Sequence, residues 1–332
     1  MVHGVINIRK EKGFTSHDVV AKLRGIIGQK KIGHTGTLDP DATGVLPVCL
    51  GKATKLCDML TDKDKTYETV LLLGKATDTQ DISGTVLSEK AMDGIDNDAV
   101  ERCIGEFVGE YLQVPPMYSA LKVNGKKLYE LARAGIEVER KARPVIIYEI
   151  RIKEISLPRV RMEVSCSKGT YIRTLCHDIG EKLGCGGCME ELTRTKVSRF
   201  TLEDSYTLEE VRQKKEAGLL SEILVPIDEM FGQYEAVTLK RPYEALVCNG
   251  NMFFEKHINE SKDLIDGEYV RVYSNSGQFI AIYAYQQKQK EIKNTLIPKN
   301  KGISIHCITP VGNNYLLSTS AMCSMSINSL LE

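Results

Sequence analysis

The sequence predicts an α+β protein whose strands form a mostly antiparallel sheet. Segments that alternate apolar and polar residues, typical of strands, are interspersed with segments whose apolar residues recur at helical spacing. No repeating strand–helix–strand period of the kind that builds a parallel sheet is visible. Hydrophobic residues make up 42% of the 332 residues and charged residues 27%, so the chain can bury a substantial core.

The expected elements follow one another along the first 230 residues. Strands are expected at residues 2–8, 45–50, 66–73, 145–155 and 160–167, and helices at 18–27, 97–107, 126–134, 171–183 and 208–217. Ser16 is expected to cap the first helix and Thr207 the last, since their side chains can accept hydrogen bonds from backbone N–H groups. A glycine-rich loop is expected at residues 28–44 and a polar turn at 77–84.

A domain boundary is expected between residues 230 and 240. Beyond it, two strands around the turn at 274–277 predict a small β domain at residues 235–285. Residues 286–332 are rich in Lys, Asn and Ser and lose periodicity, so we expect a poorly defined tail. No apolar stretch is long enough for a membrane span or a secretory signal, and a cytoplasmic location is expected.

Charge is unevenly distributed along a chain whose formal net charge is zero. Residues 119–143 contain seven basic and three acidic side chains, whereas residues 203–235 contain nine acidic and three basic ones. A zero net charge argues against binding nucleic acid by overall charge alone. Both regions could also be ordinary solvated faces.

The ten cysteines are expected to be reduced thiols, since the chain carries no secretory signal. Cys185 and Cys188 have the spacing of half a zinc site, but no second such pair accompanies them and His177 would supply a single further ligand. We therefore expect two small thiols in a tight glycine turn, and no metal.

The densest group of candidate functional residues lies between Gly33 and Gly44 (GHTGTLDPDATG). Three glycines within twelve residues indicate tight backbone turns. Pro40 disfavours α conformation at Asp39, so the carboxylate is expected on an extended loop. Judged by residue type alone, Asp-Pro more often simply starts a turn, and His34 is more often a loop or core histidine.

Two further segments hold polar residues at the ends of regular elements. Residues 165–174 (SCSKGTYIRT) predict a strand, a glycine turn and a helix with Tyr171 and Arg173 in its first turn. A cation in the first turn of a helix is unfavourable by about 0.3–1 kcal/mol, because the helix dipole is positive at that end. Arg173 therefore needs a carboxylate or phosphate partner, unless it is a surface residue. Tyr67 lies on a strand between polar neighbours in residues 65–68 (KTYE).

Taken together, these segments resemble the signatures of the TruB family of pseudouridine synthases. Four motifs occur in the family's order: residues 33–55 (GHTGTLDPDATGVLPVCLGKATK), 65–68 (KTYE), 166–175 (CSKGTYIRTL) and 182–211 (KLGCGGCMEELTRTKVSRFTLEDSYTLEEV). The resemblance covers residues 2–230 and, more loosely, the chain up to 285. Residues 286–332 match nothing expected of the family.

The resemblance implies a pseudouridine-synthase fold, with a mixed, mostly antiparallel sheet flanked by helices in a catalytic domain at residues 1–230. It also implies an RNA-clamping insertion at residues 114–143 and a PUA-like RNA-binding domain at 235–285. In the insertion, Tyr118 and Tyr129 are interleaved with basic residues expected to contact RNA: Lys122, Lys126, Lys127 and Arg133.

Catalytic roles carry over residue by residue from the resemblance. Asp39 matches the catalytic aspartate, Arg173 the arginine that pairs with it, and Tyr67 the tyrosine beside the target base. Tyr171 and Leu192 match positions that line the substrate.

Two basic residues complete the implied site. His34 matches the histidine associated with the rearranged RNA loop. Lys10 matches a basic residue near the site, but Glu11 follows it where the family often has proline.

The implied activity is isomerisation of uridine to pseudouridine at position 55 in the T-loop of tRNA, after the base is flipped out of its stack. Asp39 would act as a nucleophile at C1′ or C6, or accept the C2′ proton; the sequence does not separate these routes. No cofactor is expected, because nothing is oxidised or hydrolysed. The expected partner is the T-arm of tRNA, without an obligatory protein, and the expected state is a monomer.

Two other functions fit the same motifs. One is the guide-RNA-dependent relative, which usually brings extra N-terminal sequence and a fuller PUA domain. The other is a non-catalytic RNA-binding or RNA-folding protein on the same scaffold.

Overall fold

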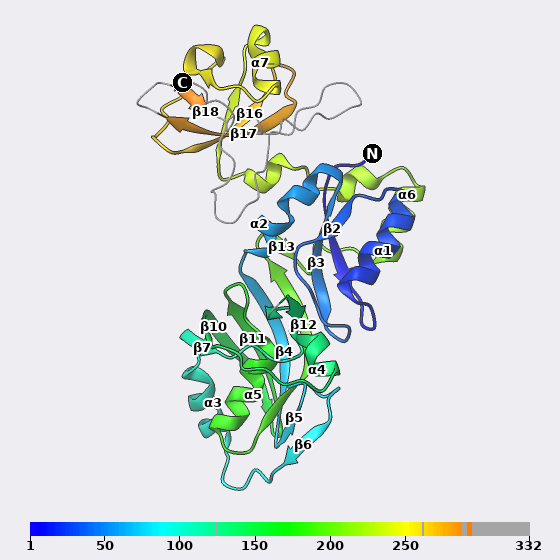
Figure 1. The fold of residues 1–332 in the computed structure, drawn as a ribbon, viewed down its shortest axis with the longest axis vertical. Helices are drawn as coiled ribbons and strands as arrows, with labels where there is room; N and C mark the ends of the chain where they lie inside the picture. Colours follow the sequence, from blue (N-terminus) through cyan, green and yellow to red (C-terminus); the bar gives the residue numbers. More distant parts are fainter. Residues whose placement is uncertain (124, 261, 287–290, 294–332) are drawn as a thin grey trace, which may run out of the picture. The chain divides into compact units, whose positions relative to one another are not determined.

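A computed structural model describes residues 1–123, 125–260, 262–286 and 291–293, and divides the chain into two compact units, residues 1–224 and 225–332 (Figure 1). Each unit has its own sheet. Among the described residues, no helix combines the length and the apolar character needed to cross a membrane.

The first unit is built on a nine-stranded sheet. Its main path runs β1 (Gly4–Lys10), β3 (Thr43–Leu50), β12 (Gly187–Val197), β4 (Lys65–Leu73), β11 (Arg159–Cys166), β10 (Arg143–Ser156) and β7 (Gly109–Gln113); β2 (Ile32–His34) pairs with β3 and β13 (Phe200–Thr201) with β12. Every strand pairing is antiparallel except β3 with β12, which joins the two halves of the sheet through just two residue pairs. The predicted mixed, mostly antiparallel sheet is confirmed.

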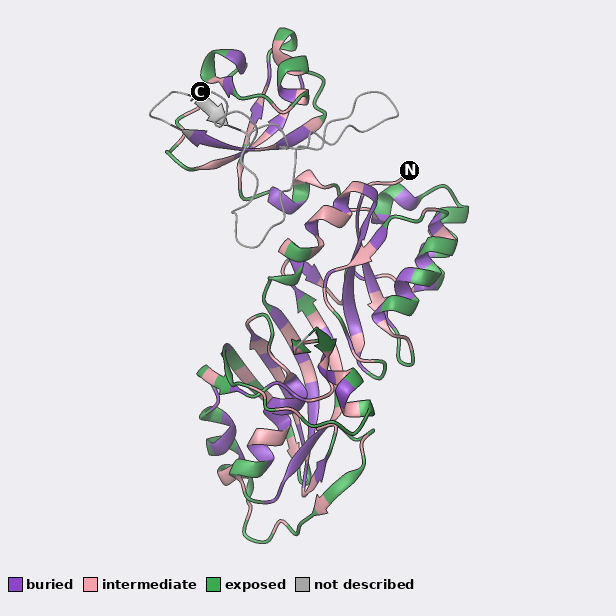
Figure 2. Ribbon diagram, in the orientation of Figure 1, coloured by how far each residue is buried: buried purple, intermediate pink, exposed green. Residues whose placement is uncertain are grey.

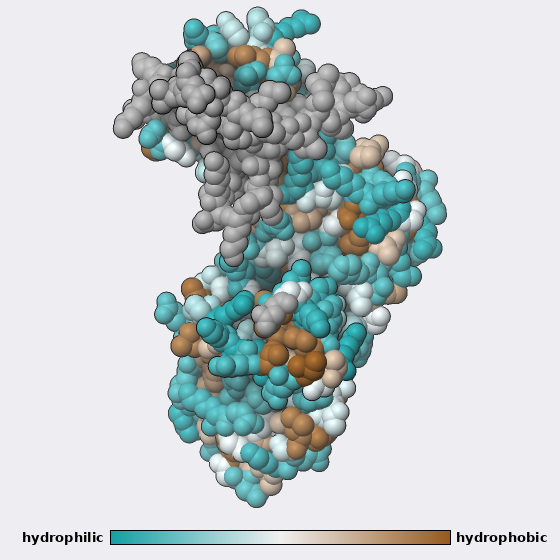
Figure 3. Space-filling model, viewed as in Figure 1, coloured by the Kyte–Doolittle hydropathy of each residue, from teal (hydrophilic) through white to brown (hydrophobic). Residues whose placement is uncertain are grey.

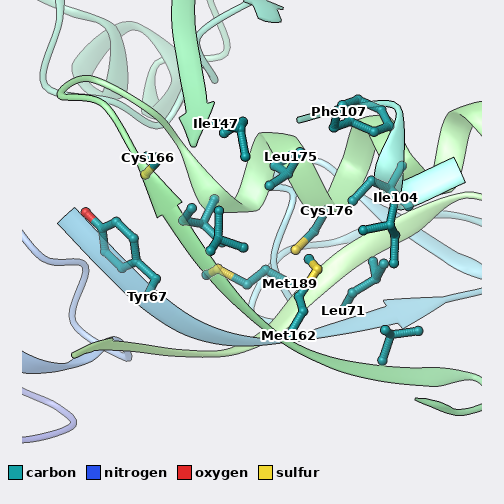
Figure 4. Packing of buried hydrophobic residues seen from close by; sticks show 14 of the residues in the cluster. Tyr67, Leu71, Ile104, Phe107, Ile147, Met162, Cys166, Leu175, Cys176 and Met189 are labelled. Atoms are coloured by element: carbon teal, nitrogen blue, oxygen red, sulfur yellow. The ribbon is translucent and has the colours of Figure 1, made fainter. Parts of the chain in front are cut away.

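Each half of this sheet packs its own helices. Helices α1 (Ser16–Ile27) and α6 (Leu208–Glu216) enclose a core with β1 and β3 that includes Leu23, Leu46 and Val211. Helices α3 (Asn97–Gly105) and α5 (Ile172–Lys182) pack on the other half, around side chains such as Leu71, Met162 and Leu175 (Figure 4). Helices α1, α3 and α6 bury their inner faces and expose their outer ones (Figure 2), the amphipathic pattern from which they were predicted. Helix α5 is buried or half-buried except at its last two residues.

Short elements complete the first unit: η1 (Gly51–Leu56), α2 (Cys57–Thr61), β5 (Lys75–Thr77), β6 (Val86–Glu89), β8 (Lys122–Val123), β9 (Lys126–Lys127), α4 (Leu128–Arg133) and η2 (Leu220–Ile223). β5 pairs with β6, and β8 pairs with β9 to form a hairpin.

The second unit holds a five-stranded sheet in the order β14 (Glu235–Thr238), β16 (Tyr269–Tyr273), β17 (Phe279–Gln286), β18 (Glu291–Lys293) and β15 (Phe253–Phe254). Its short helices are η3 (Asp228–Phe231), η4 (Arg241–Tyr243), α7 (Glu244–Cys248) and η5 (Glu255–His257). The two strands expected around the turn at 274–277 are β16 and β17. Part of the predicted tail forms the end of β17 and β18; residues 287–290 and 294–332 lie outside the described residues.

Three local predictions need correction. Thr15, not Ser16, caps α1, because its hydroxyl accepts from the N–H of Asp18 while the Asp18 carboxylate accepts from Thr15. The basic helix begins at Leu128, since Lys126 and Lys127 pair with β8. Strand β12 was not predicted at all, because its charged residues hide a strand that is paired on both sides.

Candidate active site

Asp39 lies on the loop between β2 and β3, and both of its chain neighbours are anchored. The N–H of Leu38 donates to Oγ of the buried Ser16 at 2.9 Å. The carbonyl of Pro40 accepts from Nζ of Lys10 at 3.0 Å and from the N–H of Gly13 at 2.9 Å. With both neighbours held, the loop presents the Asp39 carboxylate in a fixed place.

The Asp39 carboxylate faces the guanidinium of Arg173. The Arg173 Nη2 lies 3.1 Å from Asp39 Oδ2, and it also donates to the carbonyl of Tyr118 at 2.7 Å. Nη1 of Arg173 lies 3.5 Å from Oδ2 of a second carboxylate, Asp81. Arg173 is the second residue of α5, whose first turn has no acidic residue, so Asp39 and Asp81 supply the anionic partners that a cation at a helix N-terminus requires.

The groups around Asp39 shift the pKa of its carboxyl in opposite directions. Burial raises the pKa of the Asp39 carboxyl, the charges of Arg173 and Lys10 lower it, and Asp81 raises it again. The side chain is nevertheless 40% exposed, so a substrate can reach the carboxylate. Lys10 is fully buried, and burial lowers the pKa of its ammonium to about 8.

Tyr67 lies on β4 at one end of the larger core cluster, with its hydroxyl directed away from Met162 and Met189 (Figure 4). Burial raises the pKa of the Tyr67 phenol, and the negative charge of Asp39 raises it further. Leu192 on β12 pairs with Thr69 of β4 and packs against the same cluster.

Tyr171 occupies the N-cap position of α5, and the side chain of Gln113 holds its backbone in place. Its N–H donates to Oε1 of Gln113 at 2.8 Å, and its carbonyl accepts from Nε2 of Gln113 at 3.0 Å. Burial raises the pKa of the Tyr171 phenol, and the charges of Arg173 and Asp39 act on it in opposite directions. Tyr67 and Tyr171 thus both lie within the electrostatic reach of Asp39.

His34 ends β2 at the start of the same loop. Its Nδ1 accepts from the N–H of Gly36 at 3.3 Å, and its ring meets that of His17 edge to face at 5.3 Å. Burial lowers the pKa of the His34 imidazole to about 4, and the charges of His17 and Arg194 lower it as well. The half-buried ring is therefore neutral at neutral pH.

The basic insertion, residues 114–143, contacts Arg173 near its N-terminal end and continues into the exposed β8–β9 hairpin. Its residue Tyr118 supplies the carbonyl that binds Arg173. Lys122 and Lys126 are exposed on β8 and β9, and the cations of Lys127 and Arg133 lie 5.3 and 5.4 Å from the ring centre of Tyr129. The face of the first unit seen in Figure 3 is largely hydrophilic, with small hydrophobic patches.

Sequence reasoning missed three residues that hold this site together. Ser16 was interpreted as a helix cap, Asp81 as part of a polar turn, and Gln113 was not singled out. The turn at 77–84 does carry a signal, since two aspartates and a glutamine are unusually many polar groups beside a predicted core strand. Ser16 and Gln113 carry none, because their partners lie far away in the sequence.

The Cys185 and Cys188 side chains are buried at the turn into β12, and Sγ of Cys185 lies 3.3 Å from the carbonyl of Gly186. Across the described ranges, no three His, Cys, Asp or Glu side chains gather as a metal site would require.

Two family models match the chain in sequence. Residues 24–172 match the model described as TruB family pseudouridylate synthase (N terminal domain), and residues 173–232 match the tRNA pseudouridylate synthase B C-terminal domain. A relative from Lachnoclostridium phytofermentans, called tRNA pseudouridine synthase B, is 52% identical over 87% of this chain and 97% of its own. A relative of the same name from Clostridium perfringens is 45% identical over 89% and 99%.

Solved structures are similar over most of the chain. One is the structure of an H/ACA RNP bound to a substrate RNA containing 2′-deoxyuridine, with a TM-score of 0.63 and 27% identity. Another is a Cbf5-Nop10-Gar1 complex, with a TM-score of 0.64 and 29% identity. Each likeness covers 91% of this chain and 83% of the other. Together with the family matches, they confirm the predicted pseudouridine-synthase fold.

Proposed function

The chain belongs to the TruB family of tRNA pseudouridine synthases, and on that premise we propose that it isomerises the uridine at position 55, in the T-loop of tRNA, with Asp39 as its essential carboxylate. The observation that carries the proposal is the ion pair of Asp39 with the buried Arg173, on a loop whose flanking residues are both anchored. A carboxylate so placed is fixed, reachable and next to a guanidinium that favours its ionised form.

The reaction breaks the bond from C1′ to N1 and forms one from C1′ to C5. N1 gains a proton and C5 loses one, so nothing is oxidised, reduced or hydrolysed. Asp39 attacks C1′ or C6, or accepts the C2′ proton, and every route needs an ionised carboxylate. Burial raises the pKa of Asp39, and the charge of Arg173 opposes this by favouring the ionised carboxylate.

The detached uracil must turn over before it is rejoined, so it needs a shaped pocket that excludes water. Tyr67 offers a ring face beside the base, and Tyr171 and Leu192 line the same pocket. His34 occupies the gap left by the extruded nucleotide. A neutral imidazole suits this role, because it can stack between bases without burying a charge.

Lys10 acts through the loop and not on the substrate. Its ammonium donates to the carbonyls of Glu11 and Pro40, which fixes the residue next to Asp39. Lys122, Lys126, Lys127 and Arg133 contact the phosphate backbone of the T-arm. We expect the enzyme to work as a monomer without a protein partner.

Purified protein mixed with an unmodified tRNA transcript tests the proposal. Pseudouridine is detected by carbodiimide labelling and primer extension, and should appear at position 55 alone. No pseudouridine anywhere would favour a non-catalytic RNA-binding protein. Activity that depends on added guide RNA would favour the guide-dependent relative, which the likeness to the H/ACA RNP structure keeps as the second candidate.

A further inference from the structure

Arg194 is among the largest fully buried side chains of the described residues, and no motif assigned it a role. It lies on β12 opposite Gly44 of β3. This is one of the two residue pairs through which the halves of the large sheet meet, and Asp39 lies on the loop that leads into β3. Arg194 therefore sits where the catalytic loop joins the rest of the sheet.

The guanidinium of Arg194 binds both ends of the Asp39 loop. Nε donates to the carbonyl of Val45 at 2.7 Å, after Asp39 in the chain, and Nη2 donates to the carbonyl of Gly36 at 3.3 Å, before it. Arg194 of β12 is also the cross-strand partner of Tyr67 of β4, and its charge lowers the pKa of the Tyr67 phenol. One side chain thus ties the loop of the proposed catalytic carboxylate to the proposed base-stacking ring.

The backbone of Arg194 touches the loop as well. A Cβ added to Gly44 would lie 2.2 Å from the Arg194 carbonyl oxygen, which no real side chain could occupy. Gly44 also has φ +104°, a conformation that favours glycine. The loop therefore packs directly on the strand that carries Arg194.

Stability alone does not account for an arginine here. The acceptors described for its guanidinium are two backbone carbonyls, both neutral. A buried charge without a charged partner is expensive, and replacing buried charges with apolar residues of similar size is often neutral or stabilising. A methionine would fill the space without that penalty, but it could not hold the two loop carbonyls beside Tyr67.

We propose that Arg194 is a positioning residue that fixes the Asp39 loop relative to Tyr67. The inference rests on the proposed function, because the two groups it aligns are those assigned to the chemistry. A planar guanidinium suits this task, since its donors point in fixed directions, whereas a lysine ammonium is a single point. The charge of Arg194 also adds to the effect of burial in lowering the pKa of His34 and of Lys10.

Arg194→Met and Arg194→Lys test the proposal by separating rate, affinity and stability. The rate is that of one turnover at saturating tRNA, followed by release of tritium from C5 of labelled uridine. We expect a loss of at least about tenfold in both variants, equivalent to about 1.4 kcal/mol, with Kd for tRNA within about threefold. Arg212→Met, an exposed arginine on α6, is the matched control and should keep the wild-type rate.

A double-mutant cycle with Tyr67→Phe asks whether Arg194 acts through the tyrosine. If it does, removing the Tyr67 hydroxyl should slow Arg194→Met much less than it slows the wild type. Fully multiplicative effects would overturn the coupling between these residues.

Other outcomes overturn the assignment in distinct ways. An unchanged rate in both variants would mean that Arg194 positions nothing. If Tm, affinity for tRNA and rate all fall together in both variants, or neither variant folds, Arg194 serves the fold and not the site. If the wild type itself forms no pseudouridine in the same assay, the proposed function fails first.

Discussion

The Asp39 loop and the basic insertion differ in how they are held. The loop, residues 33–44, is anchored on several sides by Ser16, Lys10 and Arg194. The insertion, residues 114–143, is tied at its base by the Tyr118 carbonyl, whereas its hairpin carries exposed lysines.

This difference separates two tasks. Bond making needs groups fixed to within a fraction of an ångström, and anchored neighbours provide that. Reading an RNA backbone needs cations that reach phosphates, and exposed side chains provide that at little cost in stability. Changes in the loop should therefore alter the rate or the fold, and changes in the hairpin should alter affinity.

The largest expected effect is that of Asp39→Asn. Asparagine fits the same space and can still accept a hydrogen bond from Arg173, but it has no charge and is a poor nucleophile and base. We expect no measurable turnover, with Kd for tRNA within about threefold because binding is spread over many contacts. Measurable turnover would show that Asp39 is not the catalytic carboxylate. A large loss of affinity would show that the Asp39 loop also contributes to tRNA binding.

Gly44→Ala should destabilise the fold far more than Gly13→Ala. Both glycines have positive φ, which costs about 1–2 kcal/mol for alanine. A Cβ at Gly44 would also clash with the Arg194 backbone, adding about 1–3 kcal/mol, whereas a Cβ at Gly13 would meet nothing within 4 Å. Urea unfolding of the two variants measures the difference. Equal losses would show that the loop does not pack tightly on β12.

The pH dependence of the rate tests the ion pair. Burial raises the pKa of Asp39 and Arg173 lowers it, so the wild-type rate should fall as pH drops through the pKa of Asp39. Arg173→Met removes the charge that favours the ionised form, so this pKa should rise and the acid limb should move to higher pH.

The matched control for that experiment is Arg159→Met, which removes an exposed arginine paired with Glu190. It should leave the acid limb in place. A limb that stays unmoved in Arg173→Met would mean that Arg173 does not set the ionisation of Asp39.

Local patterns predicted most of the first unit, because helix periodicity and strand alternation are encoded within short windows. The sequence also placed Asp39, Arg173 and Tyr67 in motifs that the structure brings within electrostatic reach of one another. It could not place Arg194, whose acceptor at Gly36 is 158 residues away. Strand β12 was missed because its charged residues mask the alternation expected of a strand, although it is paired on both sides.

Replacing Lys126 and Lys127 together by alanine should affect affinity and leave the chemistry intact. We expect Kd to rise about tenfold at low salt, and the slope of log affinity against log salt to fall by about 0.7–0.9 for each phosphate that the protein no longer neutralises. The single-turnover rate at saturating tRNA should hold. Lys153→Ala, which removes an exposed lysine of β10 paired with Glu163 of β11, is the control and should change neither quantity.

The smallest expected difference is between whole tRNA and a hairpin that carries only the T-arm. In the proposed reaction a single extruded base reaches Asp39, so recognition must come from the surrounding loop and stem. The basic stretch of the insertion, residues 119–143, spans 25 residues, enough for one stem-loop, and the zero net charge argues against a continuous basic surface along a whole tRNA. The two RNAs should therefore show rates within about threefold and similar salt slopes. A much steeper slope for whole tRNA, or an inert hairpin, would mean that cations outside the insertion read the wider tRNA fold, and the division between a fixed loop and a local clamp would no longer hold.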